Sequence, residues 1–246
     1  MVSGARAGAA RADDDAQMSA AARAAAELVP DAAIVGLGTG TTVAHLLPVL
    51  AERAAGHTFV ATSDSTEALA ARLGIPIERF DDIAHLDVAI DGADEIAPDG
   101  WLIKGGGGAH VREKIVAANS SRFIVIGSAR KEVRRLGRAV PVEVLSFGAA
   151  ATLEDLRRFG EVVLRSPEPT LNGGLLADVH ARLSDPRTLS DQLDGLPGVL
   201  GHGLFGPELV DDIIVGRAEG VVHRTIDHGP SSPHSDRDLP GAQPQS

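Results

Sequence analysis

The chain has no cysteine among its 246 residues. It can therefore form neither a disulfide nor a thiolate metal site, and it has no cysteine nucleophile. It also lacks any apolar run of the length that a membrane-spanning helix needs. Residues 1–16 contain no apolar segment of the kind found in a secretory signal, so we expect a cytoplasmic protein that does not bind membranes.

Positive charge is scarce, since 23 Lys and Arg stand against 34 Asp and Glu, for a formal net charge of -11. This balance argues against a nucleic-acid partner, which normally requires a basic patch. It leaves room for an anionic substrate, because a few cations and backbone N–H groups bind a phosphate locally. The nine histidines show no metal-ligand spacing, and no serine stands in a nucleophile elbow. We therefore expect no metal.

Strands and helices alternate between two tails, residues 1–15 and 227–246, which we expect to be disordered. This alternation predicts an open, mostly parallel, Rossmann-like α/β sheet with helices on both faces. The predicted strands of this part are 32–35, 58–61, 86–90, 123–126 and 212–215, and its predicted helices are 17–28, 43–53, 66–73 and a segment ending near 119.

The pattern changes from Pro141 onward, where the order becomes β-α-β-β-α-β. That order is typical of a smaller ferredoxin-like α+β domain. Its predicted strands are 141–145, 161–165, 174–179 and 199–205, and its predicted helices are 150–159 and 187–194. We thus predict a Rossmann-like catalytic domain over 16–138 and 208–226, and a ferredoxin-like domain over 139–207.

A glycine-rich segment, Gly36-Leu37-Gly38-Thr39-Gly40-Thr41-Thr42, follows the first predicted strand. Glycine lets the backbone approach a ligand, and the helix that follows offers unpaired N–H groups at its positive end. The segment therefore favours anion binding, although a tight strand–helix turn would also need glycine. A dinucleotide fingerprint requires a third glycine where Thr41 stands, so a nucleotide-dependent dehydrogenase is the weaker interpretation.

A second polar segment, Asp91-Gly92-Ala93-Asp94-Glu95, comes at the end of the strand predicted over 86–90. Ligands of open α/β sheets bind outside the carboxyl ends of the strands. Two carboxylates three residues apart can share such a site, where one holds a hydroxyl and the other exchanges protons. A solvated turn explains the same residues equally well, because Asp and Gly are common in turns.

A third segment begins at Lys104, which is followed by four glycines and then by a helix that contains Glu113. A glycine run that opens a helix supplies several unpaired N–H groups at one point, as an oxyanion hole requires, and Lys104 adds a cation. On the helix, Glu113 shares its face with Ala109, Val116 and Ala117, which is unusual for a solvated glutamate. The alternative is a glutamate that only complements the helix dipole.

Lys131 lies in the loop after the strand predicted over 123–126. A single lysine is usually a surface charge. Its place at the same edge of the sheet as the three polar segments favours a phosphate contact.

Together these segments resemble the ribose-5-phosphate isomerase A family. The matching segments are 36–42, 91–95, 104–107, 112–114, 141–144 and 197–199. The resemblance extends from about residue 17 to residue 225, which is nearly all of the chain between the two predicted tails. Several spaced motifs in the right order are far more specific than one glycine loop.

The resemblance implies an aldose–ketose isomerase of the pentose phosphate pathway, which interconverts ribose 5-phosphate and ribulose 5-phosphate through an enediolate. Glu113 would be the base that carries the proton between C2 and C1, and Lys104 would stabilise the enediolate oxygen. Asp91 and Asp94 would hold sugar hydroxyls, and Asp91 would help to open the furanose ring. The implied substrate-binding residues are Thr39, Gly40, Thr41, Thr42, Asp91, Gly92, Ala93, Asp94, Lys104, Gly105, Gly106, Gly107 and Lys131. The family implies no cofactor and a homodimer or homotetramer.

Three positions depart from the family pattern. Ser128 stands where an acidic residue is frequent, Leu171 precedes Asn172-Gly173 in place of aspartate, and residues 17–20 lack a lysine found in many members. An alternative function is a sugar-phosphate-sensing module of the same fold, as in some bacterial regulators. Such a module would need no proton-transfer base and would need a DNA-binding segment, whereas Glu113 is present and the N-terminal residues show no helix-turn-helix.

Overall fold

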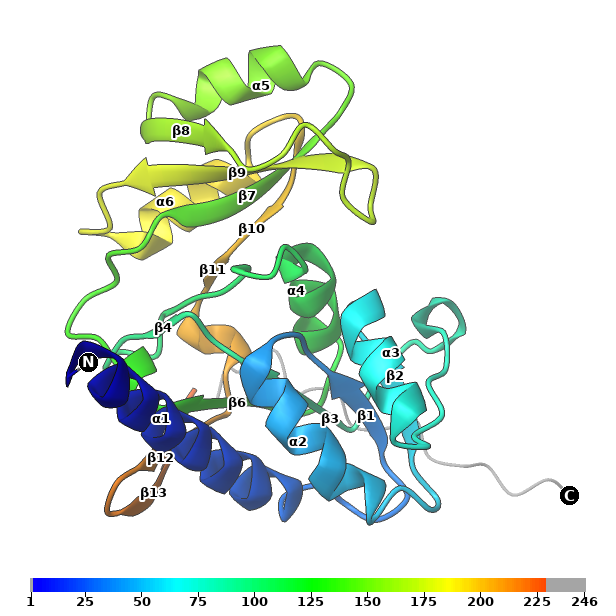
Figure 1. Cartoon of the computed structure of the whole chain (residues 1–246). Helices are drawn as coiled ribbons and strands as arrows, with labels where there is room; N and C mark the ends of the chain where they lie inside the picture. The colour runs from blue at the N-terminus through cyan, green and yellow to red at the C-terminus, as the bar shows by residue number, and fades with distance from the viewer. Residues whose placement is uncertain (1, 229–246) are drawn as a thin grey trace, which may run out of the picture.

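The computed structural model describes residues 2–228, which form six α-helices and three β-sheets (Figure 1). Of the predicted tail over 227–246, all but the first two residues lie outside this range. The helices are α1 (Val2–Ala26), α2 (Thr41–Ala51), α3 (Asp64–Arg72), α4 (His110–Ala118), α5 (Ala149–Leu156) and α6 (Pro186–Asp194), with short 3₁₀ helices at Phe80–Asp82, Ala129–Lys131 and Pro207–Leu209. Within residues 2–228, none of the helices is both long enough and apolar enough to cross a bilayer.

The largest sheet has six strands in the order β13-β12-β6-β3-β1-β2. They are β1 (Ile34–Leu37), β2 (Thr58–Ala61), β3 (Val88–Gly92), β6 (Phe123–Ser128), β12 (Asp212–Arg217) and β13 (Gly220–Thr225). All neighbours are parallel except β13, an edge strand that the sequence pattern did not predict. Every residue of β3 and β6 is buried, as is typical of strands covered on both faces. The predicted fold class is confirmed.

Helices cover both faces of this sheet. On one face α1, α2 and α3 pack over a cluster that includes Leu46 and Leu47, neither of which is exposed. On the other face α4 contributes Val116 and Ala117, which pack with Phe205. The burial of a leucine side chain such as Leu46 or Leu47 stabilises the folded state by about 1.5–3 kcal/mol. Because both faces are covered, the carboxyl ends of the parallel strands form the edge that remains open to a ligand.

The prediction of disorder over residues 1–15 is wrong for residues 2–15, because α1 begins at Val2. Alanine is the most frequent residue of this stretch, and it has the highest helix propensity. The helix also docks on the loop after β6: buried Asp14 accepts a hydrogen bond from Ser128 and pairs with Arg130 at 2.8 Å. These contacts are tertiary, so the local pattern of apolar residues did not reveal them.

A second sheet has four antiparallel strands in the order β10-β7-β9-β8. They are β7 (Val140–Leu145), β8 (Gly160–Leu164), β9 (Gly174–Ala181) and β10 (Val199–His202). With α5 after β7 and α6 before β10, they form the split β-α-β-β-α-β arrangement. Both helices pack against one face, where Leu156 of α5 and Leu193 of α6 join Val142 and Val179 of the sheet in one apolar cluster. The other face turns toward the glycine loop before α4, since a Cβ on Gly108 would lie 3.2 Å from the side chain of Leu176.

A small third sheet, in the order β11-β5-β4, joins the two parts. It consists of β4 (Glu95–Ile96), β5 (Leu102–Ile103) and β11 (Leu204–Phe205). The single strand predicted over 199–205 is therefore wrong, because the chain leaves one sheet at Gly203 and enters another. Only glycine fits there, since a Cβ would lie 2.1 Å from the carbonyl oxygen of Lys104. The Gly203 carbonyl in turn accepts a 2.8 Å hydrogen bond from the Lys104 amide, which holds Lys104 at the end of β5.

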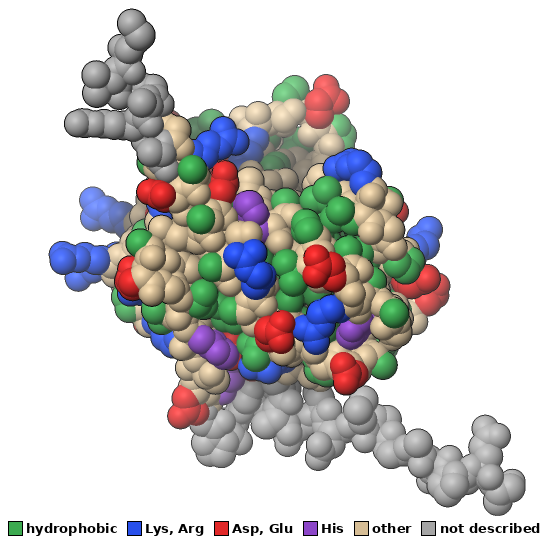
Figure 2. All heavy atoms as spheres, turned by 60° about the horizontal axis from the view of Figure 1, so that its bottom comes forward, with side chains coloured by type: hydrophobic (Ala, Val, Ile, Leu, Met, Phe, Trp, Pro, Cys, Tyr) green, Lys and Arg blue, Asp and Glu red, His purple; other side chains and the backbone are tan. Residues whose placement is uncertain are grey.

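The surface in Figure 2 shows Lys and Arg side chains interspersed with Asp and Glu. They form no continuous basic area on this face, in keeping with the net charge of -11.

Candidate active site

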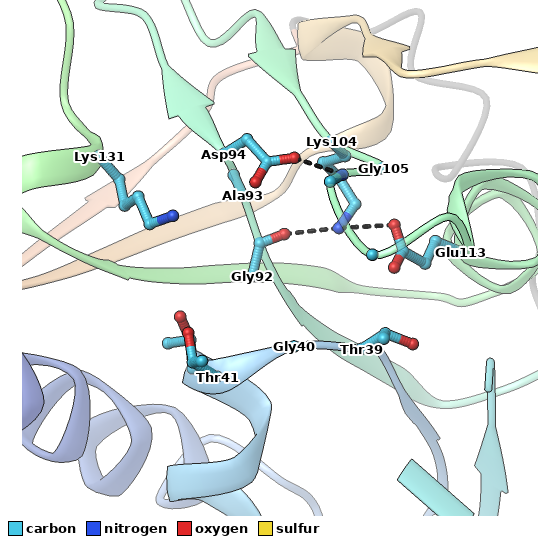
Figure 3. Close-up of a pocket in the computed structure, with 13 residues that line it drawn as sticks. Thr39, Gly40, Thr41, Gly92, Ala93, Asp94, Lys104, Gly105, Glu113 and Lys131 are labelled. Carbon is cyan, nitrogen blue, oxygen red and sulfur yellow. Dashed lines mark hydrogen bonds and ion pairs between the residues drawn. The ribbon is translucent and has the colours of Figure 1, made fainter. Parts of the chain in front are cut away.

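A pocket opens at the carboxyl edge of the large sheet, where four segments far apart in the sequence meet (Figure 3). It is lined by Thr39, Gly40, Thr41, Thr42, Gly92, Ala93, Asp94, Lys104, Gly105, Gly106, Gly107, Glu113 and Lys131. These are Glu113 and all the predicted substrate-binding residues except Asp91, which does not line the pocket. The fold therefore brings the predicted residues together, as expected for segments that follow parallel strands.

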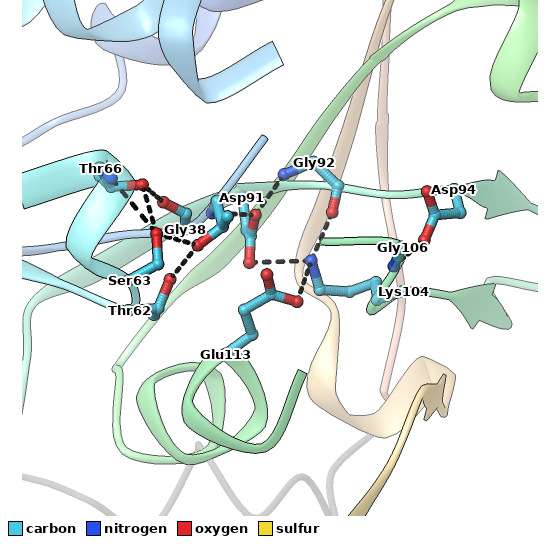
Figure 4. Close-up of polar contacts among 11 residues, drawn as sticks. Gly38, Thr62, Ser63, Thr66, Asp91, Gly92, Asp94, Lys104, Gly106 and Glu113 are labelled. Carbon is cyan, nitrogen blue, oxygen red and sulfur yellow. Dashed lines mark hydrogen bonds and ion pairs between the residues drawn. The ribbon is translucent and has the colours of Figure 1, made fainter. Parts of the chain in front are cut away.

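Lys104 lies at the centre of a buried charge cluster (Figure 4). Its Nζ atom is 2.5 Å from the Gly92 carbonyl oxygen, 2.8 Å from Oδ2 of Asp91 and 3.2 Å from Oε2 of Glu113. An ammonium has three N–H donors, and here three oxygen atoms lie within their reach. Burial opposes the charge of Lys104, but the carboxylates of Asp91 and Glu113 raise its pKa above the ordinary value. Lys104 is therefore a cation at neutral pH.

Asp91 sits behind the pocket wall, where protein groups occupy both of its oxygens. Oδ1 accepts hydrogen bonds from the amides of Thr39 and Gly92 at 3.1 and 2.7 Å, and Oδ2 faces Lys104. The Asp91 carboxylate lies so close to the glycine-rich segment 36–42 that a Cβ on Gly38 would be 1.8 Å from Cγ of Asp91. Asp91 thus links the first glycine loop to Lys104.

Glu113 lies in the first turn of α4 with only 4% of its surface exposed. Burial is the main cause that raises the pKa of Glu113 to about 7, the negative charge of Asp91 adds to it, and Lys104 acts against it. In the described part of the chain, Oε2 accepts no hydrogen bond of good geometry, although Lys104 is close. The result is a carboxylate that readily takes up and returns a proton near neutral pH, as a general base requires.

The glycine loop after Lys104 lines the pocket with Gly105, Gly106 and Gly107. Gly105 has φ = 95°, a conformation that favours glycine, and a Cβ there would lie 2.8 Å from His110. The Gly106 amide donates to Oδ2 of Asp94 at 2.7 Å. The Gly107 amide has no acceptor within residues 2–228, so it is available to a negatively charged oxygen of a ligand.

The N-terminus of α2 forms the opposite wall of the pocket. Gly40 occupies the N-cap position with φ = 108° and provides no side-chain cap, so the first N–H groups of the helix remain free for an anion. Among the described residues, the hydroxyls of Thr41 and Thr42 donate only to Sδ of Met18, at 3.8 and 3.4 Å. Because a thioether is a weak acceptor, a phosphate oxygen would replace it readily.

Lys131, at the end of the 3₁₀ helix Ala129–Lys131, points its ammonium group into the pocket (Figure 3). Burial is the main cause that lowers its pKa from the ordinary value. Within residues 2–228 it forms no ion pair, although the charge of the Asp94 carboxylate acts against the lowering of its pKa. It is the kind of cation that a phosphate would bind.

Two features of the site were not predicted. The Thr39 hydroxyl bonds to the hydroxyls of Thr62 and Ser63 at 2.8 and 2.9 Å, and these residues follow β2. Hydroxyl-rich residues after a parallel strand are the signal that could have indicated this contact. By contrast, Glu95 of the predicted acidic segment turns away from the pocket and accepts a 2.7 Å hydrogen bond from the Gly137 amide.

The fold and the site define a class of protein: an α/β protein in which an uncapped helix N-terminus and a buried carboxylate–lysine pair line one pocket. The family model for ribose 5-phosphate isomerase A (phosphoriboisomerase A) matches residues 58–220. This match covers more than half of the chain, and the chain belongs to the ribose-5-phosphate isomerase A family. The resemblance found in the sequence is thereby confirmed.

Individual relatives agree with this assignment. A ribose-5-phosphate isomerase A from Haloarcula marismortui is 43% identical over 86% of this chain and 96% of its own length. The crystal structure of ribose 5-phosphate isomerase A from Neisseria gonorrhoeae superposes with a TM-score of 0.82 and 34% identity, over 87% of this chain and 98% of that one. A D-ribose-5-phosphate isomerase in complex with phospho-erythronic acid has the same TM-score and identity over 86% and 99%.

Proposed function

We propose that this protein interconverts ribose 5-phosphate and ribulose 5-phosphate, with Glu113 as the base that moves the proton. The observation that carries the proposal is the buried Glu113 carboxylate, with a pKa of about 7, 3.2 Å from the ammonium of Lys104. Membership of the isomerase family supports the choice of substrate. A sugar-phosphate sensor would need the anion site but would have no use for this pair.

In the first step Glu113 removes the proton on C2 of the open-chain aldose. The electrons of the C–H bond form the C1=C2 double bond, and the former carbonyl oxygen O1 becomes negatively charged. Lys104 and the free Gly107 amide stabilise this charge. A positioned base typically contributes about 10²–10⁴-fold in rate, and one oxyanion donor about 10²–10³-fold.

In the second step the protonated Glu113 delivers its proton to C1. The O2 hydroxyl loses its proton as the C2=O carbonyl forms, and O1 gains one to become a hydroxyl. Atoms and charge balance without a redox partner, so the reaction requires no nucleotide. A carboxylate with a pKa of about 7 suits both steps, because it is neither a strong acid nor a strong base at neutral pH.

The phosphate binds at the opposite wall, on the N–H groups of α2, the hydroxyls of Thr41 and Thr42, and Lys131. Asp94 also lines the pocket. In the described part of the chain it accepts a hydrogen bond only through Oδ2, from Gly106, so Oδ1 is available to hold a sugar hydroxyl. Asp91 acts through Lys104, since protein groups occupy both of its oxygens. Its part in opening the furanose ring stays a prediction.

The direct test incubates the purified protein with ribose 5-phosphate, without nucleotide, and follows ribulose 5-phosphate by NMR. We expect rapid equilibration of the two sugars, and competitive inhibition by phospho-erythronic acid. In deuterated solvent we also expect label in the product, since a carboxyl proton exchanges with water. Tight binding of the sugar phosphate without turnover would overturn the proposal in favour of a sensing module.

Assembly and location remain predictions, the first from the family resemblance and the second from the sequence. We expect a homodimer or homotetramer, which light scattering of the purified chain would measure. We expect a cytoplasmic location, which fractionation of cells that produce the protein would measure.

A further inference from the structure

Arg165 connects the small sheet to the glycine loop of the pocket. It follows β8 and forms a bidentate ion pair with Asp178 of β9, with Nε 2.7 Å from Oδ2 and Nη2 2.6 Å from Oδ1. Its remaining nitrogen, Nη1, donates to the carbonyl oxygens of Gly105 and Gly106 at 2.8 and 3.2 Å. A single guanidinium therefore joins a rigid strand to two consecutive peptide groups of the loop.

These two contacts determine where the loop's amides point. In a trans peptide the C=O of one residue and the N–H of the next point in opposite directions, and the described chain has no cis peptide. Because the Gly105 carbonyl faces Arg165, the Gly106 N–H faces the other way, where it donates to Asp94. Because the Gly106 carbonyl also faces Arg165, the Gly107 N–H is directed away from Arg165 as well.

The loop needs such an external contact. Glycine has more accessible backbone conformations than any other residue, and four of them stand in a row from Gly105 to Gly108. Within the loop the one backbone hydrogen bond runs from the Gly108 amide to the Gly105 carbonyl, at 3.0 Å. That bond closes a turn but leaves the peptide between Gly106 and Gly107 unrestrained. The planar fork of arginine binds both oxygens of one carboxylate through two nitrogens while its third nitrogen reaches the carbonyls, and the point-like ammonium of a lysine cannot reproduce this geometry.

We propose that Arg165, held by Asp178, is a positioning residue that orients the peptides of the glycine loop so that the Gly107 amide faces the enediolate oxygen. It acts through the loop and does not line the pocket. The inference rests on the proposed function, because the amide matters only if negative charge develops on the substrate oxygen.

The test is steady-state kinetics of Arg165→Ala in the full chain. Displacements of about 1 Å in a catalytic group can lower the rate by about 10². We therefore expect kcat to fall by roughly 10–10²-fold while KM, which depends on the remote phosphate site, changes much less. Added guanidinium ion at millimolar concentration should restore part of kcat in this variant and leave the wild type unchanged. Arg165→Lys should remain impaired, because it keeps the charge without the fork.

The matched control is Arg182→Ala. Arg182 follows β9, is exposed and forms no ion pair within residues 2–228. The kcat of the Arg182→Ala variant should therefore equal that of the wild type. A wild type without isomerase activity would overturn the proposed function itself. An active wild type with an unimpaired Arg165→Ala variant would overturn only the positioning role. A variant with a lower melting temperature, reduced kcat and no guanidinium rescue would also overturn it, since that pattern indicates a purely structural residue.

Discussion

The Nζ atom of Lys104 lies 3.2 Å from Oε2 of Glu113, and at most 4% of either residue is exposed. The proposed proton acceptor and the proposed charge stabiliser thus share one desolvated space. In the proposed reaction, negative charge leaves the Glu113 carboxylate as it takes a proton and appears on the substrate oxygen, while the Lys104 cation stays adjacent to both. Such preorganised charges act strongly because they need no rearrangement during the reaction.

Glu113→Gln should lower kcat by about 10²–10⁴-fold, because glutamine keeps the size of the side chain but cannot accept the C2 proton. The fold and the binding of sugar phosphate should persist, as measured by circular dichroism and calorimetric titration. Glu161→Gln, a change at an exposed position of β8, serves as the control. Near-normal turnover by a folded Glu113→Gln protein would move the search for the base to Asp91 or Asp94.

The rate should depend on pH through Glu113. Its pKa is raised to about 7, so below that pH the carboxyl holds a proton and cannot act as a base. We expect kcat/KM to rise with pH through about 7 and then to level off. The substrate phosphate also titrates, near pH 6. The pH profile of the residual Glu113→Gln activity should keep any change caused by the phosphate and lose the rise caused by Glu113. Identical pH profiles of the variant and the wild type would contradict the assignment.

Lys131→Ala should raise KM for ribose 5-phosphate with a smaller change in kcat. The reason is that Lys131 faces the phosphate end of the pocket, away from Glu113 and the reacting carbons. Arg135→Ala removes an exposed cation nearby in the sequence and should leave both constants unchanged. If KM stays at the wild-type value in Lys131→Ala, Lys131 is an ordinary surface charge.

Gly38→Ala should displace the Asp91 side chain, because the added Cβ would lie 1.8 Å from Cγ of Asp91. Relief requires a shift of Asp91, and with it of Lys104. We expect a loss of stability of about 1–3 kcal/mol, typical of overpacking, together with reduced kcat. Gly137→Ala is the control, since a Cβ there meets no atom within 4 Å. Wild-type melting temperature and kcat in Gly38→Ala would show that the contact has no consequence.

Turnover should survive exhaustive chelation. In residues 2–228 no three His, Asp or Glu side chains are grouped so that they could hold a metal ion, and the chain has no cysteine. The proposed charge stabilisation comes from Lys104 and a backbone amide. The measurement is the isomerase rate after dialysis against a chelator, and a loss that a divalent cation restores would contradict this prediction.

Much of the fold follows from local patterns in the sequence. Buried parallel strands such as β3 and β6 appear as continuous apolar runs, because both of their faces are covered. Glycine loops and polar residues after those strands predicted the pocket, since the carboxyl ends of parallel strands share one edge. Glu113 stood out because a carboxylate among small apolar neighbours on a helix is not an ordinary solvated residue.

Only the tertiary structure decided the remaining features. Residues 2–15 look like a tail in the sequence. Their helix is held in place by the hydrogen bond that Ser128 donates to Asp14, a contact across 114 positions. In the sequence Asp91 looks like a ligand of the substrate, but it lies behind the wall with both oxygens occupied. Arg165 reaches the glycine loop from another sheet, 60 positions away. Side-chain partners at such separations depend on how the sheets pack, and no local periodicity encodes that packing.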